Sequence, residues 1–243
     1  MKSWIRCLIV LVACCWQVSV RAADTGMRLL TEEYPPYNMT LPNGQIGGIS
    51  SDVLRELFKR AGIPYRLEIL PWIRAFNLAI LDRNTCVFST TRTENREHQF
   101  KWVGPLVENV WVLYAGPRSP KNIYTLEAIR PYTVGGYDGD AESQDLIGRG
   151  FNIELTPVDE MNARKLAAGR IDFWATSKAR GGYLIAKGKI QQLKPVLAFN
   201  TVLLYLACNT GVSDMTIQQL NGLLDTMRHD GFIDQMHKRY GAE

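Results

Sequence analysis

The chain has 243 residues, of which 46% are hydrophobic and 21% are charged, with 28 Lys and Arg against 24 Asp and Glu. These fractions are typical of a globular protein, and they exclude a disordered or collagen-like chain. No apolar run reaches the roughly 20 residues that a membrane-spanning helix needs. The net charge of +4, with a pI near 8.8, raises the hypothesis of a nucleic-acid or membrane-surface partner.

Residues 1–22 have the pattern of a secretory signal peptide: a basic start, an apolar stretch and a small residue, Ala22, at the end. Cleavage after Ala22 removes three bases and no acid, which lowers the net charge from +4 to +1. A nucleic-acid partner therefore loses its electrostatic basis, and we expect an exported protein that binds no nucleic acid. The run ending at Cys14 also resembles a lipobox, so a lipid anchor there is the less favoured alternative.

Loss of the signal peptide would leave two cysteines, Cys86 and Cys208. In an exported chain they could form one disulfide. Both lie in apolar runs typical of strands, however, and this slightly favours two buried thiols. The spacing alone leaves the two interpretations open.

The patterns between residues 27 and 89 alternate between strand and helix. Apolar residues at helical spacing follow Ser51, which we expect to cap a helix that Gly62 ends. The expected elements are a strand at 27–31, a helix at 51–62, a strand at 65–69, a helix at 72–80 and a strand at 86–89.

A second series of the same kind begins at residue 133. A short strand leads into the glycine-rich Gly135–Gly139, and Asp140 can cap the helix that follows. Further on we expect a strand at 153–156, a helix at 159–168, a strand at 171–176, and two helices over 213–240 separated at Asp230-Gly231. Two long extended segments, 103–116 and 196–208, flank this second series.

The two series predict an α/β protein in which two open α/β sheets are joined by two hinge strands. Open α/β sheets bind ligands beyond the carboxyl ends of their strands, so a ligand cleft is expected between the sheets. The expected division is lobe I at 23–107 and 204–243, with lobe II at 108–203.

Few residues suggest catalysis. The three histidines are not spaced as metal ligands, and no nucleophile motif or nucleotide-binding loop is present. The acid pairs Glu32-Glu33 and Asp138-Asp140 are interpreted as solvated loop charges. We therefore expect no enzymatic activity, no catalytic residue, no metal and no cofactor.

The segment from Ser89 to Arg96 is the strongest functional signal. It lies where a strand ends and a helical turn can begin, so hydroxyls, free backbone N–H groups and guanidinium groups gather at the expected cleft. Such an arrangement receives an anion, because arginine offers a rigid fork to a carboxylate.

Several motifs resemble the family 3 extracellular solute-binding proteins, the receptors of polar amino-acid ABC importers. Thr93-Glu94-Asn95-Arg96 followed by Phe100 is similar to the T-x-E-R…F signature of that family, with the acid one place early. The further similar segments are 30–37, 48–57, Gly169-Arg170-Ile171-Asp172 and 230–241. The resemblance covers the mature chain and implies a periplasmic-binding-protein type II fold, a monomer in the periplasm, a small polar ligand and an inner-membrane ABC permease as partner.

The resemblance also assigns roles to single residues. It implies that Arg96 grips the ligand carboxylate, with Thr91 and the backbone of Ser89 beside it. Tyr34 and Trp72 match aromatic positions that sandwich the ligand. The Gly135–Gly139 loop, with Tyr137 and Asp138, matches the contribution of lobe II.

One position departs from the family pattern. Where an aspartate usually holds the ligand ammonium, counting from Asp172 leads to Ser177. Arg74 and Arg92 add positive charge near the same expected site. Together these features favour an anionic ligand or one that lacks an amine.

Two alternative functions remain. A periplasmic cyclohexadienyl dehydratase shares the implied fold but needs an acid in the cleft, and no acid can be assigned from the sequence. A sensory pair of lobes that acts with a partner protein is the other alternative.

Overall fold

The computed structural model of the protein describes residues 26–190 and 192–240. The expected signal peptide and the alternative lipid anchor at Cys14 lie outside these residues. Within them, no helix is long and apolar enough to cross a membrane.

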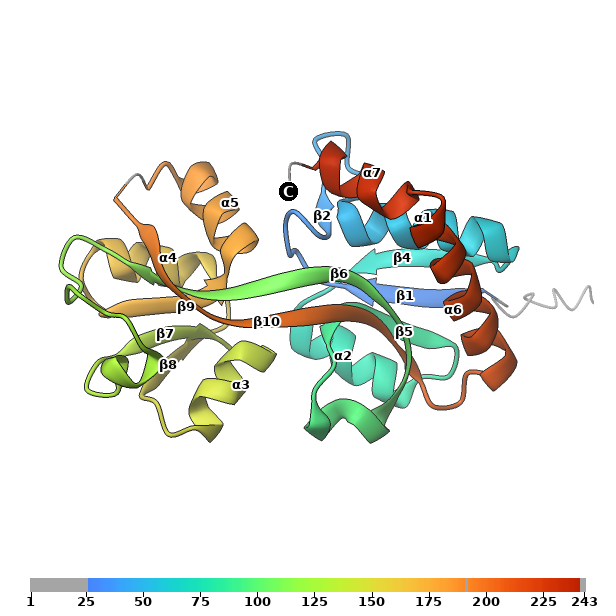
Figure 1. Cartoon of the computed structure of the whole chain (residues 1–243). Helices are drawn as coiled ribbons and strands as arrows, with labels where there is room; N and C mark the ends of the chain where they lie inside the picture. The colour runs from blue at the N-terminus through green and yellow to red at the C-terminus, as the bar shows by residue number, and fades with distance from the viewer. Residues whose placement is uncertain (1–25, 191, 241–243) are drawn as a thin grey trace, which may run out of the picture.

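The chain forms a mixed sheet of eight strands with helices on its faces (Figure 1). The strand order is β4-β1-β5-β10-β6-β9-β7-β8, and a separate two-stranded ribbon pairs β2 with β3. Both outer groups are parallel, whereas β6 and β10 run antiparallel to each other and to their neighbours β9 and β5. The strands are β1 Met27–Thr31, β2 Met39–Thr40, β3 Ile46–Gly47, β4 Tyr65–Ile69, β5 Thr85–Thr91, β6 Phe100–Ala115, β7 Val134–Tyr137, β8 Ile153–Thr156, β9 Phe173–Ser177 and β10 Lys194–Asn209.

The helices largely match the expected ones. The bounds are α1 Ile49–Ala61, α2 Trp72–Leu81, α3 Ala141–Gly148, α4 Glu160–Ala167, α5 Lys178–Gly188, α6 Asp214–His229 and α7 Phe232–Arg239, with short 3-10 helices η1 Glu94–Gln99 and η2 Leu126–Ile129. The cap at Asp140 is confirmed, because its carboxylate accepts a hydrogen bond from the backbone N–H of Ala141 at 2.8 Å.

One expectation about the helices was wrong, and one helix was missed. Ser51 does not cap α1, which begins two residues earlier after Gly48, where a φ of 113° sets the entry of the chain. A side chain at Gly48 would meet the backbone of Tyr37, so only glycine fits there. The helix α5 was not expected at all, because the adjacent Gly181 and Gly182 weaken its helical pattern.

Strands β6 and β10 connect the two halves of the molecule (Figure 1). They pair along almost their whole length, so hydrogen bonding runs through the sheet without a break. The two expected boundaries lie side by side in this ladder, because Glu108 pairs with Leu203 and Val107 pairs with Leu204. We propose that the chain divides at this level into lobe I and lobe II, with the residues given above.

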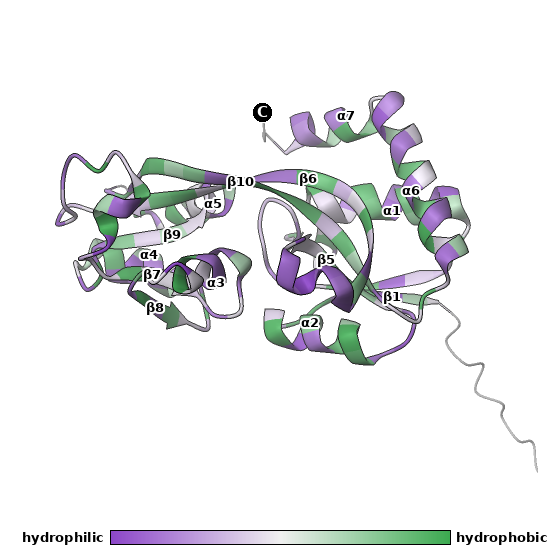
Figure 2. Cartoon of the chain, turned by 60° about the horizontal axis from the view of Figure 1, so that its bottom comes forward, coloured by the Kyte–Doolittle hydropathy of each residue, from purple (hydrophilic) through white to green (hydrophobic). Residues whose placement is uncertain are grey.

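Each half has apolar cores of its own. In lobe I, helices α1, α6 and α7 cover one face of the sheet around Leu54 and Phe58, while α2 covers the other face. In lobe II, Trp174 and Phe173 of β9 point into separate clusters on opposite faces. Figure 2 shows the corresponding pattern, in which hydrophilic and hydrophobic residues alternate along the helices that surround the sheet. Separate cores allow the two halves to move as units about β6 and β10.

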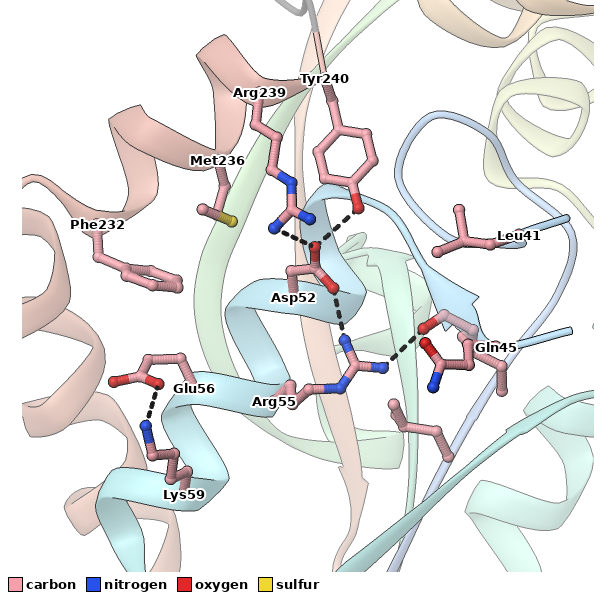
Figure 3. A pocket seen from close by; sticks show the side chains of 12 residues that line it. Leu41, Gln45, Asp52, Arg55, Glu56, Lys59, Phe232, Met236, Arg239 and Tyr240 are labelled. Atoms are coloured by element: carbon pink, nitrogen blue, oxygen red, sulfur yellow. Dashed lines mark hydrogen bonds and ion pairs between the residues drawn. The ribbon is translucent and has the colours of Figure 1, made fainter. Parts of the chain in front are cut away.

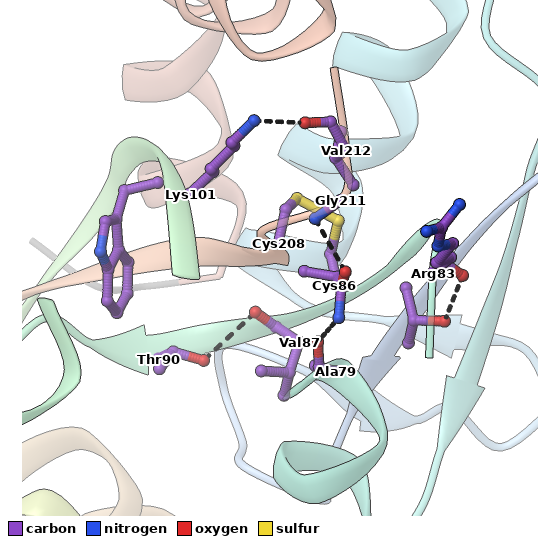
Figure 4. The surroundings of a disulfide bond; sticks show 12 residues. Ala79, Arg83, Cys86, Val87, Thr90, Lys101, Cys208, Gly211 and Val212 are labelled. Atoms are coloured by element: carbon purple, nitrogen blue, oxygen red, sulfur yellow. Dashed lines mark hydrogen bonds between the residues drawn. A yellow bond between two sulfur atoms is a disulfide. The ribbon is translucent and has the colours of Figure 1, made fainter. Parts of the chain in front are cut away.

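Cys86 and Cys208 form a disulfide, so the slightly favoured prediction of two buried thiols was wrong. The reason is the register of the sheet: the two residues lie directly opposite each other in the antiparallel pair of β5 and β10. Both are fully buried, and Figure 4 shows the bond beneath the turn that leads to Val212. The disulfide therefore fastens the lobe I end of a hinge strand to the central strand of that lobe.

Candidate functional site

The two lobes meet at a cleft, which residues of both lobes line. Two pockets open onto it, neither sharing a residue with the other. The pocket of about 330 Å³ is lined by Trp72, Arg96, Gly139 and their neighbours, and the pocket of about 430 Å³ by Glu32, Arg180 and theirs. The structure therefore places Arg96 in a pocket that residues of both lobes line.

Arg96 lies in η1 and is only 4% exposed. Its guanidinium donates to the carbonyl oxygens of Thr91 at 3.3 Å and Gly139 at 3.2 Å, and to the side-chain oxygen of Gln144 at 3.3 Å. It also lies over the ring of Phe76 at 5.0 Å. Burial lowers the pKa of Arg96, and the charge of Asp140 opposes this shift. Among the described residues no carboxylate pairs with this buried cation.

Trp72 and Gly139 touch across the cleft. The indole N–H of Trp72 donates to the carbonyl oxygen of Gly139 at 2.8 Å, so this oxygen receives donors from both Trp72 and Arg96. Gly139 has a φ of 75°, a conformation that glycine adopts freely. Gly135 and Gly136 serve packing instead, because side chains there would collide with Asn162 and Ser143 respectively. Only the last glycine of the expected loop thus reaches across the cleft.

Tyr34 and Tyr137 face the same point of the cleft from opposite lobes. The cation between them is the guanidinium of Arg180, which lies 4.6 Å from the centre of the Tyr34 ring and 4.8 Å from that of Tyr137. Asn109 of β6 orients Tyr34 by donating to its hydroxyl oxygen at 3.1 Å. Arg180 was not predicted from the sequence, because the helix that carries it was not expected.

Ser89 and Ser177 are buried and engaged within the protein. Ser89 donates to the side chain of Asn38, and its φ of 56° coincides with the irregularity in the pairing of β5 with β10. Ser177 caps α5 by accepting from the backbone N–H of Arg180 at 3.0 Å. Ser177, the position where the sequence lacks the usual ammonium-binding aspartate, therefore fixes the first turn of the helix that carries Arg180.

The structure does not gather the remaining predicted residues around Arg96. Arg92 pairs with Glu97 and lies over the rings of Trp102 and Tyr205, and its side chain is 40% exposed. Arg74 is exposed on α2, outside both cleft pockets. Asp138 donates its backbone N–H to Thr156 within lobe II, and its side chain lines neither pocket.

Glu32 was wrongly interpreted as a solvated loop charge. Its side chain is 14% exposed and lies 3.5 Å from Arg180, whereas Glu33 is exposed as expected. Burial raises the pKa of Glu32 to about 7, although the nearby charge of Arg180 opposes the shift. Asp140, which was grouped with the solvated acids, also has a raised pKa because of burial, opposed by Arg180 and Arg96.

Glu142, in the first turn of α3, is 1% exposed. Neither carboxyl oxygen has a hydrogen-bond partner among the described residues. Burial, with the charges of Asp140 and Asp159, raises its pKa well above the ordinary value of 4.5. Glu142 therefore keeps its proton at a pH where the unfolded chain has lost it.

We expect Glu142→Gln to raise the free energy of unfolding relative to the native protein, and to raise it more as the pH increases above 4.5. A group with a raised pKa in the folded state costs stability once the unfolded state ionises, and glutamine removes this cost. Urea unfolding at a series of pH values measures the difference. Glu94→Gln, at an exposed acid, is the matched control and should follow the native curve. Parallel curves for Glu142→Gln and the native protein would contradict the expectation.

A pocket of about 730 Å³, larger than the two at the cleft, lies on lobe I (Figure 3). Its charged groups pair with one another: Asp52 binds Arg55 and the hydroxyl of Tyr240, and Glu56 binds Lys59. No buried guanidinium or carboxyl group there lacks a partner in the described part of the chain. Size therefore does not identify the site, and the cleft with Arg96 is the better candidate. Over residues 26–190 and 192–240, no group of acids, histidines or cysteines could hold a metal ion.

Comparisons with known proteins agree with this fold. The family model of the bacterial extracellular solute-binding proteins, family 3, matches residues 28–243. No curated protein matches the chain.

Solved structures with the same fold include a histidine kinase sensor domain with similarity to periplasmic binding proteins, at a TM-score of 0.82 and 21% identity, covering 88% of this chain and 95% of that one. The arginine-, lysine-, histidine-binding protein of Geobacillus stearothermophilus has a TM-score of 0.78 at 17% identity, covering 90% and 96%. An ancestral amino acid-binding protein, a precursor of cyclohexadienyl dehydratase, has a TM-score of 0.75 at 18% identity, covering 89% and 95%.

Proposed function

Because the chain belongs to the bacterial extracellular solute-binding proteins, family 3, we propose that it is a periplasmic receptor that closes on a small carboxylate-bearing ligand. The receptor then presents this ligand to an inner-membrane ABC permease. β6 and β10 are the hinge in this proposal, and the cleft between the lobes is the binding site. The protein acts as a monomer with no metal or cofactor.

The observation that supports the ligand class is the state of Arg96. A buried guanidinium is costly unless an anion compensates it, and the partners of Arg96 are neutral oxygens from both lobes. A carboxylate that replaces one of these oxygens forms charge-assisted hydrogen bonds, which are about twice as strong as neutral ones. Carboxylate binding therefore stabilises the arrangement in which the two lobes meet.

A thermal-shift panel tests this proposal. The panel contains amino acids, the carboxylic acids that match them without the amino group, and simple amines. A ligand that binds only the folded protein at about 100 times its dissociation constant adds about 2.7 kcal/mol to the free energy of unfolding. We expect carboxylates to raise the melting temperature and simple amines to leave it unchanged. Stabilisation by amines alone, or by nothing in the panel, would contradict the proposal.

The acids at the cleft support a second candidate, an enzyme of the cyclohexadienyl dehydratase kind. The sequence alone assigns no acid to the departure of a hydroxyl group, but burial raises the pKa of Glu32, beside Arg180, to about 7. A carboxyl group that is half-protonated near neutral pH can act as a general acid. Release of product from prephenate or arogenate, measured with the native protein and Glu32→Gln, distinguishes this activity from binding alone.

A further inference from the structure

Arg180 occupies the centre of the cleft, although it belongs to the protein itself. Its side chain starts in the first turn of α5 in lobe II and is 7% exposed. The guanidinium lies between the ring of Tyr34 from lobe I and the ring of Tyr137 from lobe II, within 5 Å of both ring centres. A planar cation between two aromatic faces is a favourable arrangement, and burial strengthens it.

Two carboxylates complete the surroundings of this cation. Glu32 of lobe I lies 3.5 Å from the guanidinium and Asp159 of lobe II lies 3.0 Å from it. Asp159 is fixed in place, since it accepts hydrogen bonds from Trp174 at 2.8 Å and Thr176 at 2.9 Å. The four groups therefore form a binding site for a guanidinium that is built from both lobes.

We propose that the side chain of Arg180 fills a cation subsite of the cleft in place of a ligand group. Arg180 thereby determines the charge of the ligand that the cleft accepts. Arg180 supplies the positive charge that a ligand would otherwise bring to Glu32 and Asp159. A ligand amine at this point would have to displace a guanidinium held by two ion pairs and two aromatic rings. The native cleft therefore takes a carboxylate that has no cationic group at this subsite, a ligand class that rests on the proposed function.

Through the same contacts, Arg180 also holds the two lobes together. Its own lobe contributes Tyr137 and Asp159, and the opposite lobe contributes Tyr34 and Glu32. The pocket of about 430 Å³, which opens to solvent, is also lined by four of these residues: Glu32, Tyr137, Asp159 and Arg180. Truncation of Arg180 would join its vacated space to this pocket, so a small free guanidinium could enter.

The first experiment is chemical rescue of Arg180→Ala with ethylguanidinium. We expect this variant to have a lower melting temperature than the native protein, and ethylguanidinium at about 20 mM, far below the molar range in which guanidinium unfolds proteins, to restore part of the loss. The same salt should not raise the melting temperature of the native protein. Neutral ethylurea and sodium chloride at equal concentration are the controls and should restore nothing.

Two further variants test which side chains the stabilisation by ethylguanidinium depends on. Arg180→Ala combined with Glu32→Gln removes one carboxylate of the subsite and should lose the rescue. Arg180→Ala combined with Arg96→Ala should keep it, because ethylguanidinium has no carboxylate. A failure of the proposed carboxylate function would leave the rescue intact, so the two proposals fail separately. Absence of rescue, or equal stabilisation of the native protein, would overturn the role of Arg180.

A second measurement covers the case in which Arg180→Ala does not fold. The variant Arg180→Gln is compared with the native protein by calorimetry on glutarate and glutamate, which differ by one amino group. We expect the native protein to prefer glutarate, and the variant to shift this preference towards glutamate by about tenfold or more, as for the loss of one charge-assisted contact. An unchanged preference would overturn the proposal.

Discussion

Arg96→Ala is expected to lower the affinity for the most stabilising carboxylate of the thermal-shift panel by about 100-fold or more. The guanidinium can give that carboxylate two charge-assisted hydrogen bonds, each worth about 1.5–3 kcal/mol. Calorimetric titration measures the loss. Arg96 also bridges the lobes through Gly139 and Gln144, so the melting temperature of the free variant is recorded to show that it is folded.

The matched control is Arg170→Ala, which removes an exposed arginine in lobe II and should leave the affinity unchanged. Arg74→Ala separates the sequence-based hypothesis from the structural one. Arg74 is exposed on α2, so its loss should change the affinity far less than the loss of Arg96. Equal effects of the Arg74 and Arg96 substitutions would show that the affinity depends on net charge and not on hydrogen bonds from Arg96 to the ligand.

Replacement of both Cys86 and Cys208 by alanine is expected to lower the free energy of unfolding by about 2–5 kcal/mol. The two cysteines are 122 residues apart in sequence, and the loop-entropy relation for such a separation gives a value of about 5 kcal/mol. Urea unfolding of the native and double-variant proteins measures the change.

Reduction supplies the control for this substitution. Dithiothreitol should lower the stability of the native protein towards that of the double variant and leave the double variant unchanged. A thiol assay under denaturing conditions, on protein that begins at Ala23, should find no free thiol before reduction. Two free thiols in unreduced protein would show that the disulfide between Cys86 and Cys208 is not formed.

Most of the fold could be predicted from local patterns. Periodic apolar residues identified the strands at 27–31 and 65–69, and the alternation of strand and helix indicated two series joined by long strands. The disulfide could not be predicted in this way, because it depends on the register between β5 and β10. Residues 86 and 208 are far apart in sequence, and no local pattern sets their alignment.

The candidate site was predictable only where a local motif described it. Arg96 belongs to such a motif, and the structure places it in the cleft as expected. Arg92 looks equally basic in the sequence, but its guanidinium turns to Glu97 on the surface. Arg180 and Glu32 meet only because the lobes face each other, so neither residue shows a signal in its own neighbourhood. Ser177 was the available clue to Arg180, since a serine at the end of a strand can start a helix.

The bond between Cys86 and Cys208 closes residues 86–208 into a covalent ring that contains all of β6 and all but the last residue of β10. A protease that cuts one peptide bond in the exposed segment after β6 would open this ring without releasing a fragment. The two pieces would stay joined through sulfur and separate on a gel only after reduction. Both lobes would thus stay covalently attached to each other after a single nick.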